Sequence, residues 1–207
     1  MKKHIFYFDA LRALAIISVI LVHVFDGGTR HLIVADYGAI PSLNWFVCSF
    51  IINFFRIGVP LFLMLSGALS LGRDWTIRSF LSKRLPRIIY PFLFWLFFLS
   101  ICLVFINSFI HPLKISGFFS LITVGALGKN NYFYQDWFFW MILGTYLIMP
   151  VFNKWIQHSD MKELEYFLFF WLITCIFDFT LKMPFPIKLS YFTSPIGLVV
   201  LGYYLRY

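Results

Sequence analysis

The chain has 207 residues, of which 61% are hydrophobic and only 13% are charged, and its mean hydropathy is +0.83. A soluble globular protein usually carries about 45–50% apolar and about 25% charged residues, and a chain this short cannot bury so much apolar surface in one core. This composition excludes a soluble enzyme, a disordered chain and a nucleic-acid-binding module. The net charge of +8 comes from Lys and Arg residues spread thinly over the loops, as is typical of membrane proteins. We therefore predict an all-α polytopic protein whose partner is the lipid bilayer.

The first apolar stretch, Phe6–Phe25, is long enough to cross a membrane, which takes about 20 mostly apolar residues. Met1-Lys2-Lys3 before it resembles the start of a signal peptide. However, no small-x-small cleavage site follows Val24, and Arg12 interrupts the apolar run. We therefore expect an uncleaved first helix.

The second apolar stretch, Trp45–Leu71, is interrupted near Arg56 and Pro60. We expect a short piece, Trp45–Phe55, and then a membrane helix, Ile57–Leu71, with the proline in its first turn, where proline is tolerated. Non-helical backbone at membrane depth occurs only where protein buries it or where it lines a wet cavity. The break therefore indicates a cavity.

Four further stretches complete a predicted set of about six transmembrane helices: Ile88–Ile106, Tyr132–Val151, Leu164–Phe179 and Phe192–Leu205. Ile115–Leu127 is apolar but too short to span a bilayer, and its length favours an interfacial or re-entrant segment. We expect one transmembrane domain over residues 1–207.

The basic residues of the loops predict the orientation, because cytoplasmic segments carry an excess of Lys and Arg. If the N-terminus is inside, the inside segments hold Lys2, Lys3, Arg73, Arg78, Lys83, Arg84, Arg87, Lys154, Lys162 and Arg206. The outside segments hold the smaller set of Arg30, Lys114, Lys129, Lys182 and Lys188. The excess predicts a cytoplasmic N-terminus, and the loop Gly72–Arg87 contributes most to it.

Ionisable groups inside apolar spans are costly, so each is a candidate functional residue. Arg12 and His23 are eleven positions apart (12 to 23), close to three helical turns, which puts them on one face about 16 Å apart along the axis. Asp9 precedes Arg12 by three residues and can pair with it. The structural alternatives are that Arg12 snorkels to the cytoplasmic interface with Asp9 as its partner, and that His23 sits at the outer interface without a chemical role.

Other polar candidates lie at the break and in the cytoplasmic loop. Arg56 falls at the break, with Ser66 further along the same segment, and it either lines the cavity or marks a helix boundary. Arg84 and Arg87 form either a positive-inside anchor or a phosphate-binding patch, because the guanidinium group suits bidentate phosphate contacts.

Asp136 and Trp137 stand at the start of the fourth predicted helix. The acid either stabilises the helix N-terminus or orients a substrate hydroxyl or a histidine. The cysteines are far apart in apolar stretches and show neither metal-ligand spacing nor a disulfide framework; they are Cys48, Cys102 and Cys175.

Four segments carry recognisable motifs in a fixed order. They are Phe8-Asp9-Ala10-Leu11-Arg12-Ala13-Leu14-Ala15 continuing to Val22-His23, Phe55-Arg56-Ile57-Gly58-Val59-Pro60-Leu61-Phe62-Leu63-Met64-Leu65-Ser66-Gly67, Arg84-Leu85-Pro86-Arg87, and Tyr134-Gln135-Asp136-Trp137-Phe138-Phe139. Together they resemble the acyltransferase-3 family of integral membrane acyltransferases. The matching motifs are Arg-x10-His, Gly-Val-x-Leu-Phe-x-x-x-Ser-Gly, Arg-x-x-Arg and Tyr-His-Leu-Trp-Phe, the last with Gln135-Asp136 in place of His-Leu. Because family members have more membrane spans than this chain, the resemblance predicts a C-terminally truncated member.

The resemblance implies transfer of an acyl group, often acetyl, from acyl-CoA to a hydroxyl of a cell-surface or envelope carbohydrate at the bacterial inner membrane. His23 would act as the general base or carry the acyl group transiently, and Arg12, Arg84 and Arg87 would hold the CoA phosphates. Acyl-CoA would be a co-substrate, and neither a bound cofactor nor a metal is implied. The remaining substrate-binding candidates are Arg56, Ser66, Asp136 and Trp137.

Two alternatives stay open at this point. A transporter or flippase of a glycan or lipid-linked sugar also uses polar residues in broken helices, although paired related halves are expected there and no such repeat is visible. An inactive, truncated family member is the other alternative.

Overall fold

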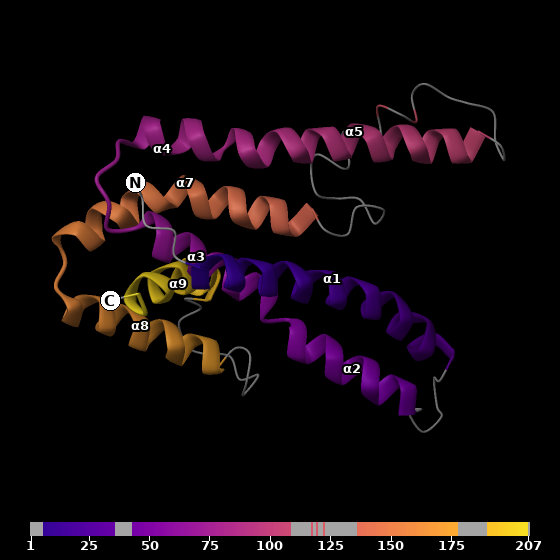
Figure 1. Cartoon of the computed structure of the whole chain (residues 1–207), viewed down its shortest axis with the longest axis horizontal. Coiled ribbons are helices and arrows are strands. Elements are labelled where there is room, and N and C mark those ends of the chain that lie inside the picture. The colour runs from indigo at the N-terminus through magenta and orange to yellow at the C-terminus, as the bar shows by residue number, and fades with distance from the viewer. Residues whose placement is uncertain are drawn as a thin grey trace. The chain divides into compact units, whose positions relative to one another are not determined.

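The computed structural model describes residues 6–35, 43–108, 117, 119, 122, 136–177 and 190–206. Within these residues the regular structure is helical and there is no strand, which confirms the predicted all-α fold class. The chain divides into two compact units: Met1–Gly72 together with His158–Tyr207, and Arg73–Gln157. Figure 1 shows the helices of both units.

Five helices build the first unit: α1 (Phe6–Ala35), α2 (Leu43–Phe55), α3 (Gly58–Ser70), α8 (Met161–Cys175) and α9 (Ser190–Tyr204). α1 packs side by side with α2 (Figure 1) and also contacts α3. α9 packs against α3 and α8. α3 is therefore the helix that joins the N-terminal part of this unit to its C-terminal part.

The break between α2 and α3 confirms the predicted division of the second apolar stretch. Pro60 lies in the first turn of α3, where backbone N–H groups have no partner inside the helix, so its missing N–H costs little. α3 ends before Gly72, whose φ of +67° lies in the left-handed region that favours glycine and often follows a helix C-terminus.

α3 and α9 cross at a close approach of their backbones. A Cβ atom at Gly67 would collide with the carbonyl of Val199, and one at Gly202 would collide with the carbonyl of Met64. Small residues at such positions let membrane helices approach closely. The C-terminal ends of the two helices lie together, because Arg206 Nη1 donates a hydrogen bond to the Ala68 carbonyl at 2.6 Å.

α8 contacts α9 through an aromatic ring and a hydrogen bond. The buried Trp171 ring lies against Gly197, where any side chain would overlap it. The Tyr204 hydroxyl donates a hydrogen bond to Glu165 Oε1 at 3.0 Å. The lack of a side chain at Gly197 therefore allows the large tryptophan to reach the backbone of α9.

The second unit contains α4 (Ile77–Arg84), α5 (Pro86–Ser108) and most of α7 (Asp136–His158). Thr76 caps α4, because its Oγ1 accepts a hydrogen bond from the Ser79 N–H at 3.2 Å. The sequence predicted a loop over the whole of Gly72–Arg87, and α4 shows that this was wrong. The prediction relied on long apolar runs, whereas α4 is short and polar and starts at a capping threonine.

Aromatic rings fill the contacts of the second unit. Phe80 is buried, stacks on Trp75 with ring centroids 4.2 Å apart and meets Tyr146 edge-on at 6.0 Å. Phe92 of α5 stacks on Phe139 of α7 at 3.7 Å. Ring contacts therefore link α4 to α7 and α5 to α7.

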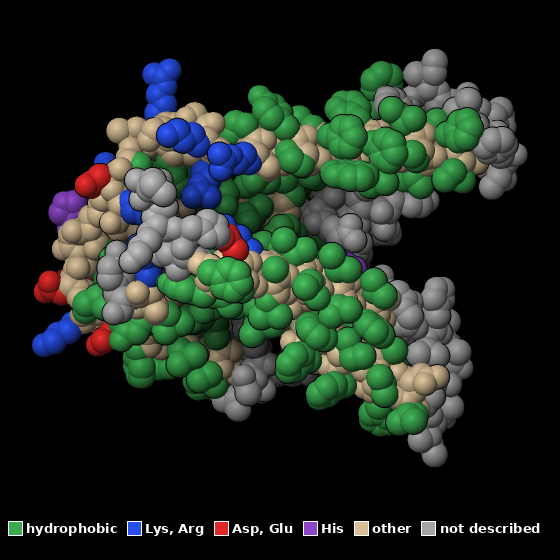
Figure 2. All heavy atoms as spheres, in the orientation of Figure 1, with side chains coloured by type: hydrophobic (Ala, Val, Ile, Leu, Met, Phe, Trp, Pro, Cys, Tyr) green, Lys and Arg blue, Asp and Glu red, His purple; other side chains and the backbone are tan. Residues whose placement is uncertain are grey.

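Three helical stretches in the described part of the chain are long and apolar enough to cross a membrane: Phe6–Asp26, Leu43–Ser70 and Ile77–Ile106. Pro195–Tyr204 is a shorter apolar helix. Large apolar side chains lie exposed on the outer surface of α5 (Figure 2), as at Phe94 with 61% and Trp95 with 53% of its surface exposed. Such surfaces are unfavourable in water and are expected where helices contact lipid.

The remaining predicted segments correspond to helices of the structure or lie outside the described residues. Ile88–Ile106, Leu164–Phe179 and Phe192–Leu205 correspond to α5, α8 and α9. α7 continues past the predicted end of Tyr132–Val151, because its last turns are polar and the prediction counted apolar residues only. Most of the predicted interfacial segment, Ile115–Leu127, lies outside the described residues.

Candidate active site

Arg12 and His23 lie on one continuous helix, α1, so their predicted placement on one face is confirmed. At 3.6 residues per turn, His23 is rotated by only about 20° from Arg12. Arg12 Nη1 donates to Asp9 Oδ1 at 2.8 Å, and the two side chains are 49% and 41% exposed. The predicted pairing of these residues is therefore confirmed, and His23 is also exposed.

The stripe that carries Arg12 and His23 borders the packed face of α1. Phe8, Ala15 and Ser18 are buried on that face. Viewed down the helix axis, Arg12 lies between His23 and Val19, at about 20° from each. Val19 lies against α3. The two ionisable side chains are therefore exposed along the edge where α1 meets α3.

The turn between α2 and α3 lies against the middle of α1. A Cβ atom at Gly58 would stand 2.9 Å from the Ala15 carbonyl oxygen and 3.0 Å from Val19 Cγ2, so the absence of a side chain allows this approach. Arg56 is exposed in the same turn, two positions earlier. The structure therefore brings the turn of Arg56 to the part of α1 that separates the two ionisable residues of the stripe.

Ser66 lies elsewhere on α3. It is partly buried and precedes Gly67, the residue that touches the backbone of α9. Ten residues separate it from Arg56 (56 to 66), which is about 15 Å of helix. Ser66 is therefore placed beside the crossing of α3 with α9, and the structure does not bring it together with Arg56.

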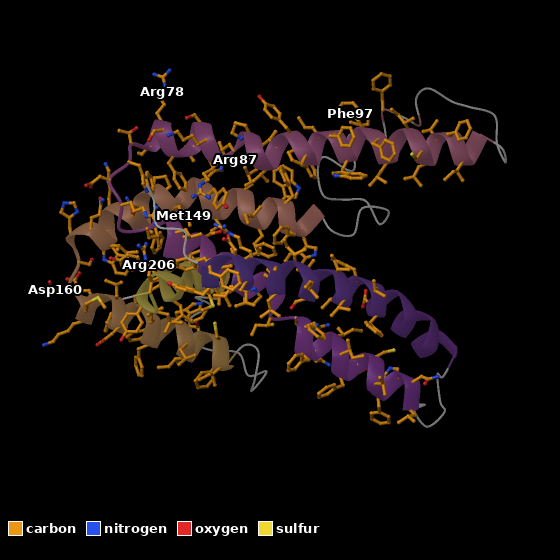
Figure 3. All side chains as sticks on the ribbon, in the orientation of Figure 1. Arg78, Arg87, Phe97, Met149, Asp160 and Arg206 are labelled. Atoms are coloured by element: carbon orange, nitrogen blue, oxygen red, sulfur yellow. The ribbon has the colours of Figure 1, made fainter. Side chains whose placement is uncertain are left out.

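Arg84 and Arg87 lie in the second unit, where α4 meets α5. The guanidinium carbon of Arg84 lies 5.8 Å from the centroid of the Phe80 ring, within cation–π range. Arg87 is exposed. Lys and Arg side chains gather at this end of the unit, whereas the rest of α5 is covered by apolar side chains (Figure 2), and Figure 3 labels Arg78 and Arg87 among them.

Asp136 and Trp137 begin α7 in the same unit. The side chain of Asp136 lies outside the described residues, and Trp137 is 53% exposed. Because Phe139 stacks on Phe92, the start of α7 lies beside the second turn of α5 rather than at the basic junction with α4.

Sequence reasoning missed two sets of polar contacts. Arg206 counted only as one more basic residue. A cation after an apolar helix signals a bond to the last carbonyls of that same helix, whereas Arg206 follows α9 and binds the Ala68 carbonyl of α3. Asn153 Nδ2 and Gln157 Nε2 both donate to the Arg73 carbonyl at 3.0 Å and tie the segment before α4 to α7. Nothing in the local sequence around Asn153 indicates that contact, because 80 residues separate the partners.

The described residues contain no group of three or more His, Cys, Asp and Glu side chains that could hold a metal ion. Each of the three cysteines is half-buried and outside any disulfide. The exposed polar groups along the edge of α1, with the turn of Arg56 beside them, are therefore the candidate site of the first unit.

Comparison with known proteins identifies the family. The profile of a family described as an acyltransferase domain matches residues 5–207, nearly the whole chain. No match was found among curated proteins or among solved structures. The matched range contains the stripe of α1, the break between α2 and α3 and the basic junction of α4 with α5. The chain belongs to the acyltransferase-3 family and is a membrane acyltransferase.

Proposed function

We propose that this acyltransferase moves an acetyl group from cytoplasmic acyl-CoA to a hydroxyl of a cell-surface or envelope carbohydrate. In this proposal the protein lies in the bacterial inner membrane with its N-terminus in the cytoplasm. The observation that carries the proposal is the exposed stripe of Arg12 and His23, which runs along the edge of α1 beside the turn of Arg56. It gives one helix a cation near one end and an imidazole about 16 Å further along.

His23 suits the proton transfer that this reaction needs. A sugar hydroxyl is a weak nucleophile, and a histidine side chain can accept its proton near neutral pH. The hydroxyl oxygen then forms a bond to the thioester carbonyl carbon, and the bond between that carbon and sulfur breaks. The proton on the imidazole passes to the departing thiolate, so the products are the acetyl ester and CoA with a free thiol.

Arg12 suits the phosphates of the donor. Asp9 holds one part of its guanidinium at 2.8 Å, and the planar fork of an arginine can bind a phosphate through its other N–H groups. The exposed Arg56, beside the middle of the stripe, would then contact the substrate between the phosphates and the thioester.

The remaining candidates keep substrate-binding roles as part of the proposal. For Arg84 and Arg87, the support for phosphate contacts is the group of basic side chains at their own end of the second unit (Figure 2). For Ser66 and Trp137 the support is their place in the family motifs alone. Asp136 departs from its motif, and it keeps its role only because an acid at that position can orient a substrate hydroxyl or a histidine.

The test replaces His23 by alanine and follows label from acetyl-CoA to surface glycan in isolated membranes. Loss of a general base costs about 10²–10⁴-fold in rate, so we expect His23→Ala to lose transfer while the protein still inserts. His158→Ala, a change of an exposed histidine at the end of α7, is the matched control and should keep the full rate. Full activity of His23→Ala would contradict the proposal. Substrate movement with all label left on CoA would favour a transporter.

A second measurement separates the two possible roles of His23. Purified protein is incubated with labelled acetyl-CoA and no acceptor, and label bound to the protein is measured. Label that depends on His23 indicates a covalent acyl-histidine. Transfer in the complete reaction without any labelled protein indicates a general base.

A further inference from the structure

A cavity of about 170 Å³ lies in the first unit at the end of α1 that carries Arg12. Tyr7 and Phe8 line it from α1, Leu65 and Ala68 from α3, and Arg206 from the end of α9. Pockets that hold a whole drug-sized ligand have about 300–1,000 Å³. This cavity is therefore too small for a complete CoA molecule and has room for one ring system.

Arg206 supplies a planar cation at the edge of the cavity. Its Nη1 donates to the Ala68 carbonyl at 2.6 Å, which fixes the guanidinium beside the apolar lining (Figure 3). Guanidinium planes stack on flat ring systems, and aromatic side chains do the same. Two aromatic residues and one arginine around a small apolar space are chemistry that recognises a nucleobase.

The position of the cavity along α1 decides which part of the donor can reach it. Phe8 and Leu11 line it, and they precede His23 by fifteen and twelve residues (23 − 8 and 23 − 11), or about 22 and 18 Å of helix. A thioester that reacts at His23 is therefore too far away to place its acetyl group in the cavity. In CoA the adenine stands at one end, the phosphates follow and the thioester stands at the other end. The cavity, Arg12 and His23 follow one another along α1 in that same order.

We infer that the cavity between α1, α3 and α9 binds the adenine ring of the acyl-CoA donor. This inference rests on the proposed function. It adds α9 to the donor site through Arg206 and Gly202, neither of which the predicted motifs include.

The test measures binding of adenosine 3′,5′-bisphosphate, the nucleotide end of CoA, to the purified full-length chain in detergent by calorimetry. Leu61→Trp fills the cavity from α3 and leaves Arg206 in place. We expect it to weaken nucleotide binding about tenfold, the effect of losing about 1.4 kcal/mol of base stacking. Pantetheine, which lacks the nucleotide, should bind the variant and the wild type equally.

Lys162→Met is the matched control, because Lys162 is an exposed basic residue on α8 that does not line the cavity. It should bind the nucleotide like the wild type, whereas Arg206→Met should bind it more weakly. Equal nucleotide binding by Leu61→Trp and wild type, or no binding by the wild type, would overturn the inference. So would an equal loss of pantetheine and nucleotide binding, which would show a general packing defect. The test measures nucleotide binding and not acetyl transfer. A protein that binds the nucleotide in the cavity but transfers no acetyl group would therefore contradict the proposed function and leave this site standing.

Discussion

The two units of the chain use different kinds of contact between their helices. In the first unit the helices meet at glycine positions. Backbone meets backbone at Gly58 against α1 and at Gly67 and Gly202 where α3 crosses α9, and a ring of α8, that of Trp171, lies on the backbone of α9 at Gly197. In the second unit the helices meet through aromatic rings, with Phe80 on Trp75 and Tyr146 and with Phe92 on Phe139.

The difference bears on how firmly each group of candidate residues is held. A backbone contact cannot be relieved by rotating a side chain, and packed interiors transmit such strain. The spacing between the stripe of α1 and the turn of Arg56 is set by two backbones at Gly58. Arg84 lies instead over an aromatic side chain, the ring of Phe80. We therefore expect glycine changes in the first unit to have larger effects than ring changes in the second.

The largest effect is expected for Gly67→Ala. The added methyl group would overlap the Val199 carbonyl, so α3 and α9 must separate, at a cost of about 1–3 kcal/mol or more for an overpacked contact. Gly144→Ala in α7 is the matched control, because a Cβ atom there would meet nothing within 4 Å. It should be neutral or stabilising, since glycine costs about 1 kcal/mol relative to alanine in a helix. Thermal unfolding in detergent measures the stability of both variants. Equal unfolding midpoints would show that the backbone crossing of α3 with α9 is not tightly packed, which would contradict the difference between the two units.

A smaller loss of stability is expected for Phe80→Leu. Leucine keeps much of the apolar burial but removes the stacking on Trp75 and the edge contact with Tyr146, and aromatic pairs contribute about 0.5–1.5 kcal/mol beyond burial. Phe97→Leu on α5 is the control, because Phe97 is 45% exposed (Figure 3) and loses little by the change. Unfolding midpoints in detergent should fall for the first variant only. Equal midpoints for the two would show that the ring contacts contribute nothing to the second unit.

Much of the fold could be predicted because a helix that spans the bilayer needs about 20 mostly apolar residues, and such runs are visible in the sequence. The apolar runs gave the first helix and the break near Arg56, and helical spacing alone put Arg12 and His23 on one face. α4 was missed because a short, polar helix lacks an apolar run. The glycine crossing of α3 and α9 was also missed, because Gly67 and Gly202 are far apart in the sequence and nothing local pairs them.

The candidate site was predictable to a lesser degree. The sequence supplied its ionisable residues, because charges are scarce in apolar spans and each is conspicuous. It could not show that the stripe borders the packed face of α1, since this depends on the contact at Gly58. The cavity next to Phe8 was also beyond reach, because α9 contributes Arg206 from the other end of the chain.

Removing a polar contact of the second unit is expected to lower the stability less than removing its ring contacts does. Asn153→Ala removes the buried amide that donates to the Arg73 carbonyl, and a typical hydrogen bond contributes about 1 kcal/mol. Gln157→Ala removes a second donor to the same carbonyl, but Gln157 is exposed, so water can replace it. The unfolding midpoint should therefore fall for Asn153→Ala and hardly change for Gln157→Ala. The reverse order would show that the carbonyl depends on the outer donor.

The smallest effect is expected for Tyr204→Phe. This change removes only the hydroxyl that donates to Glu165 between α8 and α9, and that bond lies in an exposed position where water offers both groups another partner. The ring of Trp171 against Gly197 still holds the two helices together, so the unfolding midpoint should fall by less than in Asn153→Ala. A loss as large as that of Gly67→Ala would mean that a side-chain hydrogen bond holds the first unit as firmly as its backbone crossing does. The contrast drawn between the two units would then be wrong.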